Sequence, residues 1–196
     1  MNGRKISHQQ ENPIDNIYIY LSKYISSFLH DNISFMSPNI ITTISLIVSL
    51  IGTYLIYLKY YKLGAILYLI GYIFDCLDGY YARRYKMTSV FGDYYDHLSD
   101  IIKHSLMLYV ILILNIKKKT KIIIIFIIFV FYSLTSLYTC HQELNSKSKD
   151  DTVLKYIKII CNNPENIKYS RYFGTGTFQL IYFLLLFFID ELNNYV

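Results

Sequence analysis

The sequence is poor in cysteine and in charge. Its three cysteines, Cys76, Cys140 and Cys161, are scattered and odd in number. Their spacing matches neither a metal-binding cysteine cluster nor a disulfide framework, so we expect neither. The first 12 residues contain no signal-peptide pattern and are polar, and we expect residues 1–12 to form a disordered tail. Charged residues make up only 17% of the chain.

Apolar runs, in contrast, are long and frequent, and hydrophobic residues make up 54% of the chain. About 20 apolar residues in a helix cross the ~30 Å core of a bilayer. Five stretches are candidate spans: residues 39–58, 63–81, 92–116, 122–138 and 178–189. A weaker stretch, residues 153–160, is the candidate for a sixth. We therefore predict an all-α integral membrane protein, a bundle of five or six transmembrane helices.

One membrane domain is expected over residues 37–190, followed by a polar tail at 191–196. The net charge of +5 fits an anionic membrane surface. A chain of this hydrophobicity is a poor candidate for binding nucleic acid, so we expect membrane lipids and no nucleic acid among its partners.

An amphipathic segment precedes the first span, within residues 13–36. Asn12 suits a helix cap and Pro13 a first turn, and apolar residues recur at helical spacing from Ile14 to Phe28. One interpretation is a helix that lies in the membrane interface. The other is an ordinary amphipathic helix packed on its own protein.

The most informative stretch is residues 75–100, which holds five aspartates between apolar segments. Ionisable side chains at membrane depth are costly and usually mark function. Asp75 and Asp78 are three residues apart, and Asp96 and Asp100 are four apart, so each pair shares one face of a helix. Carboxylates so close together repel one another unless cations lie between them. Hard cations prefer carboxylate oxygens, which predicts two Mg²⁺ or Mn²⁺ ions.

Further residues in this stretch are suited to a phosphate ligand. Gly79 and Gly92 allow close approach of a backbone or a flat ligand, and Ala82 is small. Arg83 supplies a fixed cation.

These residues together resemble the signature of the CDP-alcohol phosphatidyltransferases, D-x2-D-G-x2-A-R-x8-G-x3-D-x3-D. Every fixed position is filled: Asp75, Asp78, Gly79, Ala82, Arg83, Gly92, Asp96 and Asp100. Eight specified residues within 26 positions make a specific pattern. The resemblance covers residues 37–116 and fades over the C-terminal third. The family core has six spans, preceded by an interfacial helix.

The resemblance implies that an acceptor hydroxyl displaces CMP from a CDP-linked alcohol. Asp75, Asp78, Asp96 and Asp100 would bind the two metal ions, and Asp100 would also act as the catalytic base. Gly79, Ala82, Arg83 and Gly92 would contact the nucleotide and diphosphate. Asn39 and Thr42 at the start of the first span would border the same site. Lys103 is a candidate for phosphate binding or for pairing with Asp100, and Arg171 for lining the acceptor pocket.

The substrate pair stays open between two classes of the family. One class uses CDP-diacylglycerol with a polar alcohol, and the other uses CDP-choline or CDP-ethanolamine with diacylglycerol. The oligomeric state also stays open, with a homodimer as one candidate. Lysine and arginine number 12 on the signature side and six on the other, which predicts a cytosolic active site.

Three other functions fit part of the pattern. An aspartate-rich membrane prenyltransferase would need a second aspartate-rich motif and more spans than the sequence provides. A non-enzymatic cation-binding membrane protein would leave Gly79, Ala82, Arg83 and Gly92 unexplained. A degenerate, inactive homologue is disfavoured because all signature residues are present.

Overall fold

The computed structural model describes residues 3–146 and 153–195, and in these residues it contains helices and no strands. The elements are α1 (Pro13–Asn32), α2 (Pro38–Tyr57), α3 (Tyr61–Arg84), α4 (Val90–Ile113), α5 (Lys118–Asn145), η1 (Val153–Ile159), η2 (Pro164–Asn166), α6 (Ile167–Ser170), η3 (Arg171–Phe173), α7 (Thr175–Phe187) and α8 (Ile189–Tyr195). The prediction of an all-α membrane protein is confirmed.

Helix starts follow the local capping chemistry. The Asn12 side chain accepts hydrogen bonds from two backbone N–H groups at the start of α1, with Pro13 in the first turn. Ser37 caps α2 and Ser89 caps α4 in the same way. The start of α1 is the one that the sequence predicts, and α4 begins at Val90, two residues before the expected start at residue 92.

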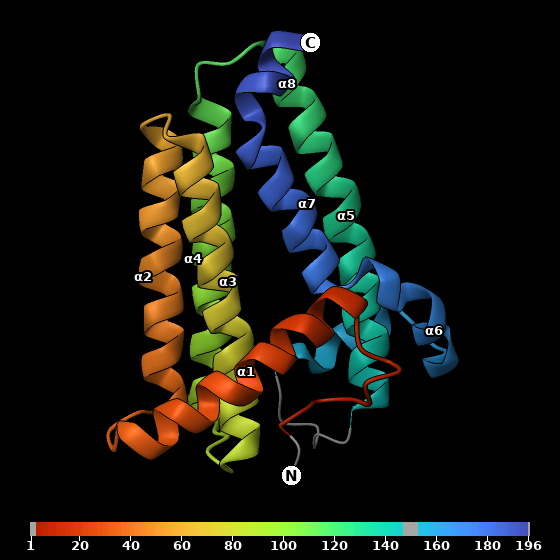
Figure 1. Ribbon diagram of the computed structural model, residues 1–196. Helices are drawn as coiled ribbons and strands as arrows, with labels where there is room; N and C mark the ends of the chain where they lie inside the picture. Colours follow the sequence, from red (N-terminus) through yellow and green to blue (C-terminus); the bar gives the residue numbers. More distant parts are fainter. Residues whose placement is uncertain (1–2, 147–152, 196) are drawn as a thin grey trace.

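Five helices, α2, α3, α4, α5 and α7, lie lengthwise in the bundle (Figure 1). By length and composition, α2, α3 and α5 are each able to cross a membrane. The segment 164–187 and α8, bent by 64° at the break between them, add a fourth only if the two together form one span. The helix α4 is long enough but not apolar enough to count as a span, because it carries charged residues that include Asp96 and Asp100. The stretch at residues 153–160 forms only the short η1 and is too short to be a span. The described residues therefore hold three helices able to cross a membrane, or four with the bent pair, fewer than the five or six that the sequence predicts.

The helix α2 packs against α3 through small residues. A Cβ added to Gly52 would lie 2.8 Å from the Gly64 carbonyl oxygen, and one added to Gly64 would lie 2.7 Å from the Gly52 oxygen. Ser45 Oγ donates to the Gly71 carbonyl oxygen at 2.9 Å. Such close backbone contact is typical of membrane helix pairs and brings α2 near the signature.

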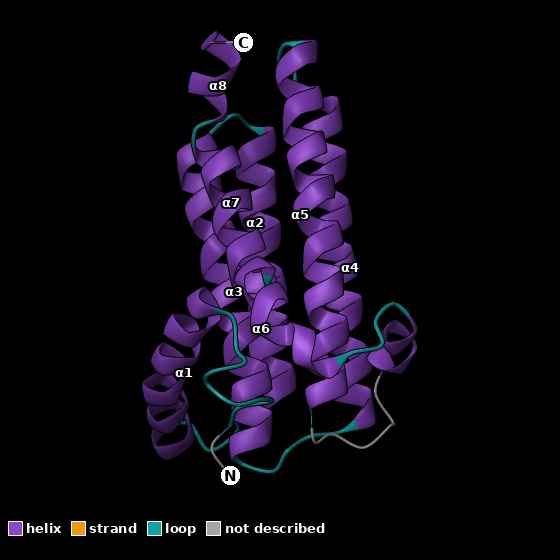
Figure 2. Cartoon of the chain, turned by 90° about the vertical axis from the view of Figure 1, so that its right-hand side faces the viewer, coloured by secondary structure: helices purple, strands orange, loops and turns teal. Residues whose placement is uncertain are grey.

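The helix α1 crosses one end of the bundle (Figures 1 and 2). Its polar side faces the protein. Asp15, Ser22 and Ser26 are buried, whereas Ile17 and Phe28 are each 63% exposed. Outward apolar residues on a helix at the bundle end indicate burial in lipid rather than in protein. The interfacial interpretation is therefore the one the structure supports.

Residues 3–12 are not a free tail, contrary to the sequence-based expectation. Lys5 pairs with the buried Glu143 of α5, and Ile6 is 7% exposed in a cluster with Tyr138 and Ile167. The expected tail at the other end also differs, because residues 189–195 form α8. Both segments find partners that local polarity does not reveal.

A disulfide joins Cys140 near the end of α5 to Cys161, and Cys76 is free. The expectation of no disulfide is therefore wrong. The two cysteines are 21 residues apart, and the chain folds back along α5 to bring them together. Scattered spacing gave no sign of this pairing.

Candidate functional site

The signature aspartates meet where the end of α3 lies beside the start of α4. Asp75, Asp78 and Asp96 each offer a carboxylate oxygen, and these atoms all lie within 4.8 Å of one another. Asp78 is 4% exposed. Their spacing of three residues on α3 places Asp75 and Asp78 on one face, as predicted. The structure thus gathers three of the four predicted metal ligands into one cluster.

The donor set of this cluster fits a divalent cation. Asp78 Oδ2 accepts a hydrogen bond from Thr42 Oγ1 at 2.5 Å. Asp96 Oδ1 is buried and has no hydrogen-bond partner. A buried carboxylate oxygen without a partner is costly, and a hard cation would satisfy it with ligands of the type that it prefers. The residues present therefore fit Mg²⁺ or Mn²⁺.

Asp100, the fourth predicted ligand, is paired with a cation of the chain itself. Lys103 Nζ lies 2.7 Å from Asp100 Oδ1 and 2.5 Å from Asp75 Oδ1. Ser45 Oγ on α2 is 3.3 Å from the same Nζ. Of the two roles expected for Lys103, the geometry matches pairing with Asp100.

The predicted phosphate-binding residues lie on the neighbouring turns of α3. The Arg83 guanidinium folds over Gly79, 3.1 Å from where a Cβ of Gly79 would lie. Arg83 Nε donates to the carbonyl oxygen of Gly3 at 2.8 Å. Ala82 is half-buried in the same turn. The N-terminal segment therefore contacts the residue predicted to steady the diphosphate.

The start of α2 closes the other side of this site. A Cβ on Gly92 would lie 3.2 Å from Asn39 Oδ1, and Thr42 contacts Asp78 as described. The structure therefore brings Asn39 and Thr42 beside the signature, and their roles toward a nucleotide stay predictions.

Arg171, the last of the predicted site residues, contacts residues outside the signature. Its carbonyl oxygen accepts from Asn12 at 2.6 Å, and its guanidinium lies 5.4 Å from the ring centroid of Tyr172. These contacts join η3 to the start of α1. They give no support to a role for Arg171 in an acceptor pocket.

Sequence reasoning missed Asp15, which connects three helices. Its Oδ1 accepts from Tyr72 of α3 at 2.6 Å, and its Oδ2 accepts from the Gly176 backbone N–H of α7 at 3.0 Å. Burial is the main cause that raises the pKa of Asp15 to about 7, and the nearby Glu11 adds to it. The sequence feature that could have identified Asp15 is its position on the polar face of an amphipathic helix.

A second polar contact, also missed, lies deeper in the bundle. His104 Nε2 is 3.1 Å from Gln179 Nε2 of α7, and His104 Nδ1 is 2.9 Å from the Asp100 carbonyl oxygen. His104 also stacks on Phe178 and Tyr182. This residue links α7 to the turn of α4 that carries Asp100.

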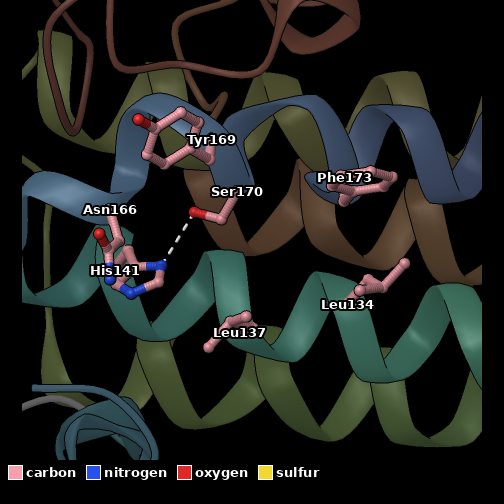
Figure 3. A pocket seen from close by; sticks show the side chains of 7 residues that line it. All are labelled: Leu134, Leu137, His141, Asn166, Tyr169, Ser170 and Phe173. Carbon is pink, nitrogen blue, oxygen red and sulfur yellow. Dashed lines mark hydrogen bonds between the residues drawn. The ribbon is translucent and has the colours of Figure 1, made fainter. Parts of the chain in front are cut away.

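A cavity of about 330 Å³ lies away from the aspartates, between α5 and the α6–η3 segment (Figure 3). It is lined by Leu134, Leu137, His141, Asn166, Tyr169, Ser170 and Phe173. His141 Nδ1 and Ser170 Oγ are 2.9 Å apart and satisfy each other. The walls are mostly apolar, which suits a hydrocarbon chain better than a diphosphate.

Comparisons with known proteins identify the family of the chain. An uncharacterized protein of Aquifex aeolicus (strain VF5) is 32% identical over 85 residues, which cover 41% of this chain and 43% of that protein. The chain thus matches less than half the length of this relative. No solved structure matches the chain significantly. The family model described as CDP-alcohol phosphatidyltransferase matches residues 35–195, nearly the whole chain, and the protein belongs to that family.

Proposed function

We propose that the protein transfers a substituted phosphate from a CDP-linked alcohol to an acceptor hydroxyl and releases CMP. The observation that carries this proposal is the cluster of Asp75, Asp78 and Asp96 with Asp100 beside it. Membership of the family supports phosphotransfer in phospholipid biosynthesis. The donor is CDP-diacylglycerol or a CDP-aminoalcohol, as the sequence leaves open.

In this reaction the acceptor oxygen forms a bond to the phosphorus that carries the alcohol. The bond from that phosphorus to the CMP oxygen breaks, and CMP leaves. Asp100 takes the proton of the attacking hydroxyl. Arg83 steadies the diphosphate, and Gly79, Ala82 and Gly92 leave room for the nucleotide. Positioning and charge neutralisation do most of the catalysis in phosphoryl transfer.

A divalent cation, Mg²⁺ or Mn²⁺, is the expected cofactor, held by Asp75, Asp78 and Asp96. When bound, it neutralises charge on the diphosphate and on the departing CMP. The sequence hypothesis has two cations, bound by Asp75, Asp78, Asp96 and Asp100 together. Of these carboxylates, Asp75 and Asp100 border Lys103 in the structure.

The active site is proposed to face the cytosol. The N-terminal segment, α1 and the signature ends of α3 and α4 lie at one end of the bundle, and α8 lies at the other (Figure 1). The excess of lysine and arginine at the signature end supports this orientation. A homodimer stays a prediction without support from the contacts of this single chain.

CMP release by the purified protein in detergent tests the proposal. Either CDP-diacylglycerol or CDP-choline, supplied with Mn²⁺ or Mg²⁺ and a panel of acceptors, should yield CMP. Asp100→Asn should lower the rate at least about 100-fold, the loss expected for a general base, while CDP-lipid binding remains. Asp96→Asn should abolish metal-dependent release, because it removes a metal ligand.

Lys62→Met, at the opposite end of the bundle, is the matched control and should keep its activity. Metal-independent release, or full activity in Asp100→Asn, would contradict the assignment. Transfer of a prenyl group without CMP release would instead favour the prenyltransferase alternative. Cation binding with neither reaction would favour a non-enzymatic protein.

A further inference from the structure

The Lys103 ammonium lies between Asp75 of the aspartate cluster and Asp100, and it is held by three helices. It contacts Asp75 of α3 at 2.5 Å, Asp100 of α4 at 2.7 Å and Ser45 of α2 at 3.3 Å. The Lys103 side chain is 5% exposed, and Asp75 is 17% exposed. The ammonium is therefore a fixed part of the site rather than a mobile surface charge.

Lys103 has little freedom to leave this position. It follows Asp100 by three residues on α4, so both side chains project from one face of the helix. A buried lysine must keep anionic or polar partners, because an unpaired buried charge is strongly destabilising. Its contacts with two carboxylates and a hydroxyl meet that need. Reaching out to a phosphate in solvent would break them.

A metal ion bound by the same two carboxylate oxygens would need nearly the same position. Divalent cations lie about 2.0–2.6 Å from their oxygen ligands, and charge-assisted N–H···O contacts are about 2.7–2.9 Å long. A metal ion and an ammonium that bridge the same pair of oxygens therefore overlap. Like charge adds to this exclusion.

Lys103 contributes to the charge balance of the site. Four ionised carboxylates, those of Asp75, Asp78, Asp96 and Asp100, carry four negative charges. With Lys103 and a single divalent cation the cluster keeps one negative charge, and a second divalent cation would give it one positive charge. Both totals are one unit from neutral, so geometry rather than net charge excludes the second ion.

We propose that Lys103 takes the place of the second divalent cation, so that the chain alone binds one Mg²⁺ or Mn²⁺ at Asp75, Asp78 and Asp96. The inference rests on the proposed function in taking this cluster as the reaction site. Lys103 is then a positioning residue: it orients the Asp100 carboxylate and replaces the charge of a metal ion. The binuclear site expected from the sequence becomes a site of one metal ion and one ammonium.

Counting bound Mn²⁺ tests this inference without turnover. Purified protein in detergent, without nucleotide, is titrated with Mn²⁺ by equilibrium dialysis and examined by electron paramagnetic resonance. The unmodified chain should bind one Mn²⁺ and give the spectrum of an isolated ion. Lys103→Met should bind two and show the broadened spectrum of neighbouring, coupled ions. Lys103→Arg and the distant control Lys62→Met should both stay at one.

Two Mn²⁺ ions in the unmodified chain would overturn the inference, whatever the variants do. A count of one in a folded Lys103→Met would overturn it as well. If Lys103→Met does not fold, Lys103→Gln serves as the neutral variant, because its amide keeps a donor near Ser45. One bound Mn²⁺ without CMP release would refute the proposed function and leave the role of Lys103 standing.

Discussion

At the scale of single residues, Asp15 shows how a buried carboxylate makes stability depend on pH. It joins Tyr72 to the N–H of Gly176, and burial raises its pKa from 3.8 to about 7. The unfolded chain loses this proton near the ordinary pKa, whereas the folded chain keeps it until about 7. The stabilisation is therefore fully present below the ordinary value and is lost as pH rises through this window.

Asp15→Asn should remove this pH dependence, since an asparagine does not ionise: its one carbonyl oxygen can accept from the Gly176 N–H, and its amide N–H can donate to the Tyr72 hydroxyl oxygen. At about pH 8 its thermal midpoint in detergent should be higher than that of the unmodified chain. The corresponding gain in the free energy of unfolding is on the order of 1–3 kcal/mol. At about pH 4 the two midpoints should be similar. An equal difference at both pH values would show that ionisation of Asp15 plays no part.

At the scale of elements, the close packing of α2 on α3 sets the position of the site. Gly52 and Gly64 let the two backbones touch, and α2 then brings Thr42 to Asp78 and Ser45 to Lys103. A larger residue between the helices would move both contacts. The aspartate cluster is thus sensitive to residues several turns away from it.

Gly64→Leu should separate α2 from α3 and destabilise the protein by about 1–3 kcal/mol, the usual cost of overpacking. It should also weaken Mn²⁺ binding, because the Thr42 and Ser45 contacts are displaced. Thermal unfolding and Mn²⁺ titration measure the two effects. Ile51→Leu on the exposed side of α2 is the control and should change neither. Unchanged midpoint and affinity in Gly64→Leu would contradict this packing.

At the scale of the whole molecule, the disulfide ties the segment after η1 back to α5. Cys140 is fully buried, and Cys161 is 7% exposed. Disulfides are rare in a reducing cytosol, so burial would have to protect this one if its end of the bundle faces the cytosol as proposed.

Titration of the unfolded, unreduced protein with a thiol reagent should find one free thiol, that of Cys76. Cys140→Ser should expose a second thiol and lower the free energy of unfolding by about 3 kcal/mol, the value typical of a closed loop of this size. Cys76→Ser is the control and should leave no free thiol. Three thiols in the unreduced chain would mean that the bond does not form.

The sequence predicted those features that local patterns determine. Capping chemistry predicts the start of α1 at Asn12, and apolar spacing predicts its interfacial position. The three-residue spacing of Asp75 and Asp78 predicts that they share one face of a helix. Contacts between distant segments were not predictable in this way. Neither the Arg83 contact with Gly3 nor the Cys140–Cys161 bond has a local signal, because each depends on how the whole bundle assembles. The sequence left two roles open for Lys103, phosphate binding and pairing with Asp100, and only its contacts in the assembled bundle distinguish them.

The contacts of the N-terminal segment also have a consequence for biosynthesis. Lys5 pairs with a residue 138 positions later, and Asp15 with one 161 positions later. Ribosomes make the beginning of the chain first, so these early residues wait until α5 and α7 have entered the bilayer. Contacts so distant in sequence form late and slowly. The end of the bundle that holds the aspartates is therefore completed only when the last helix is inserted, which keeps partly made chains from closing it.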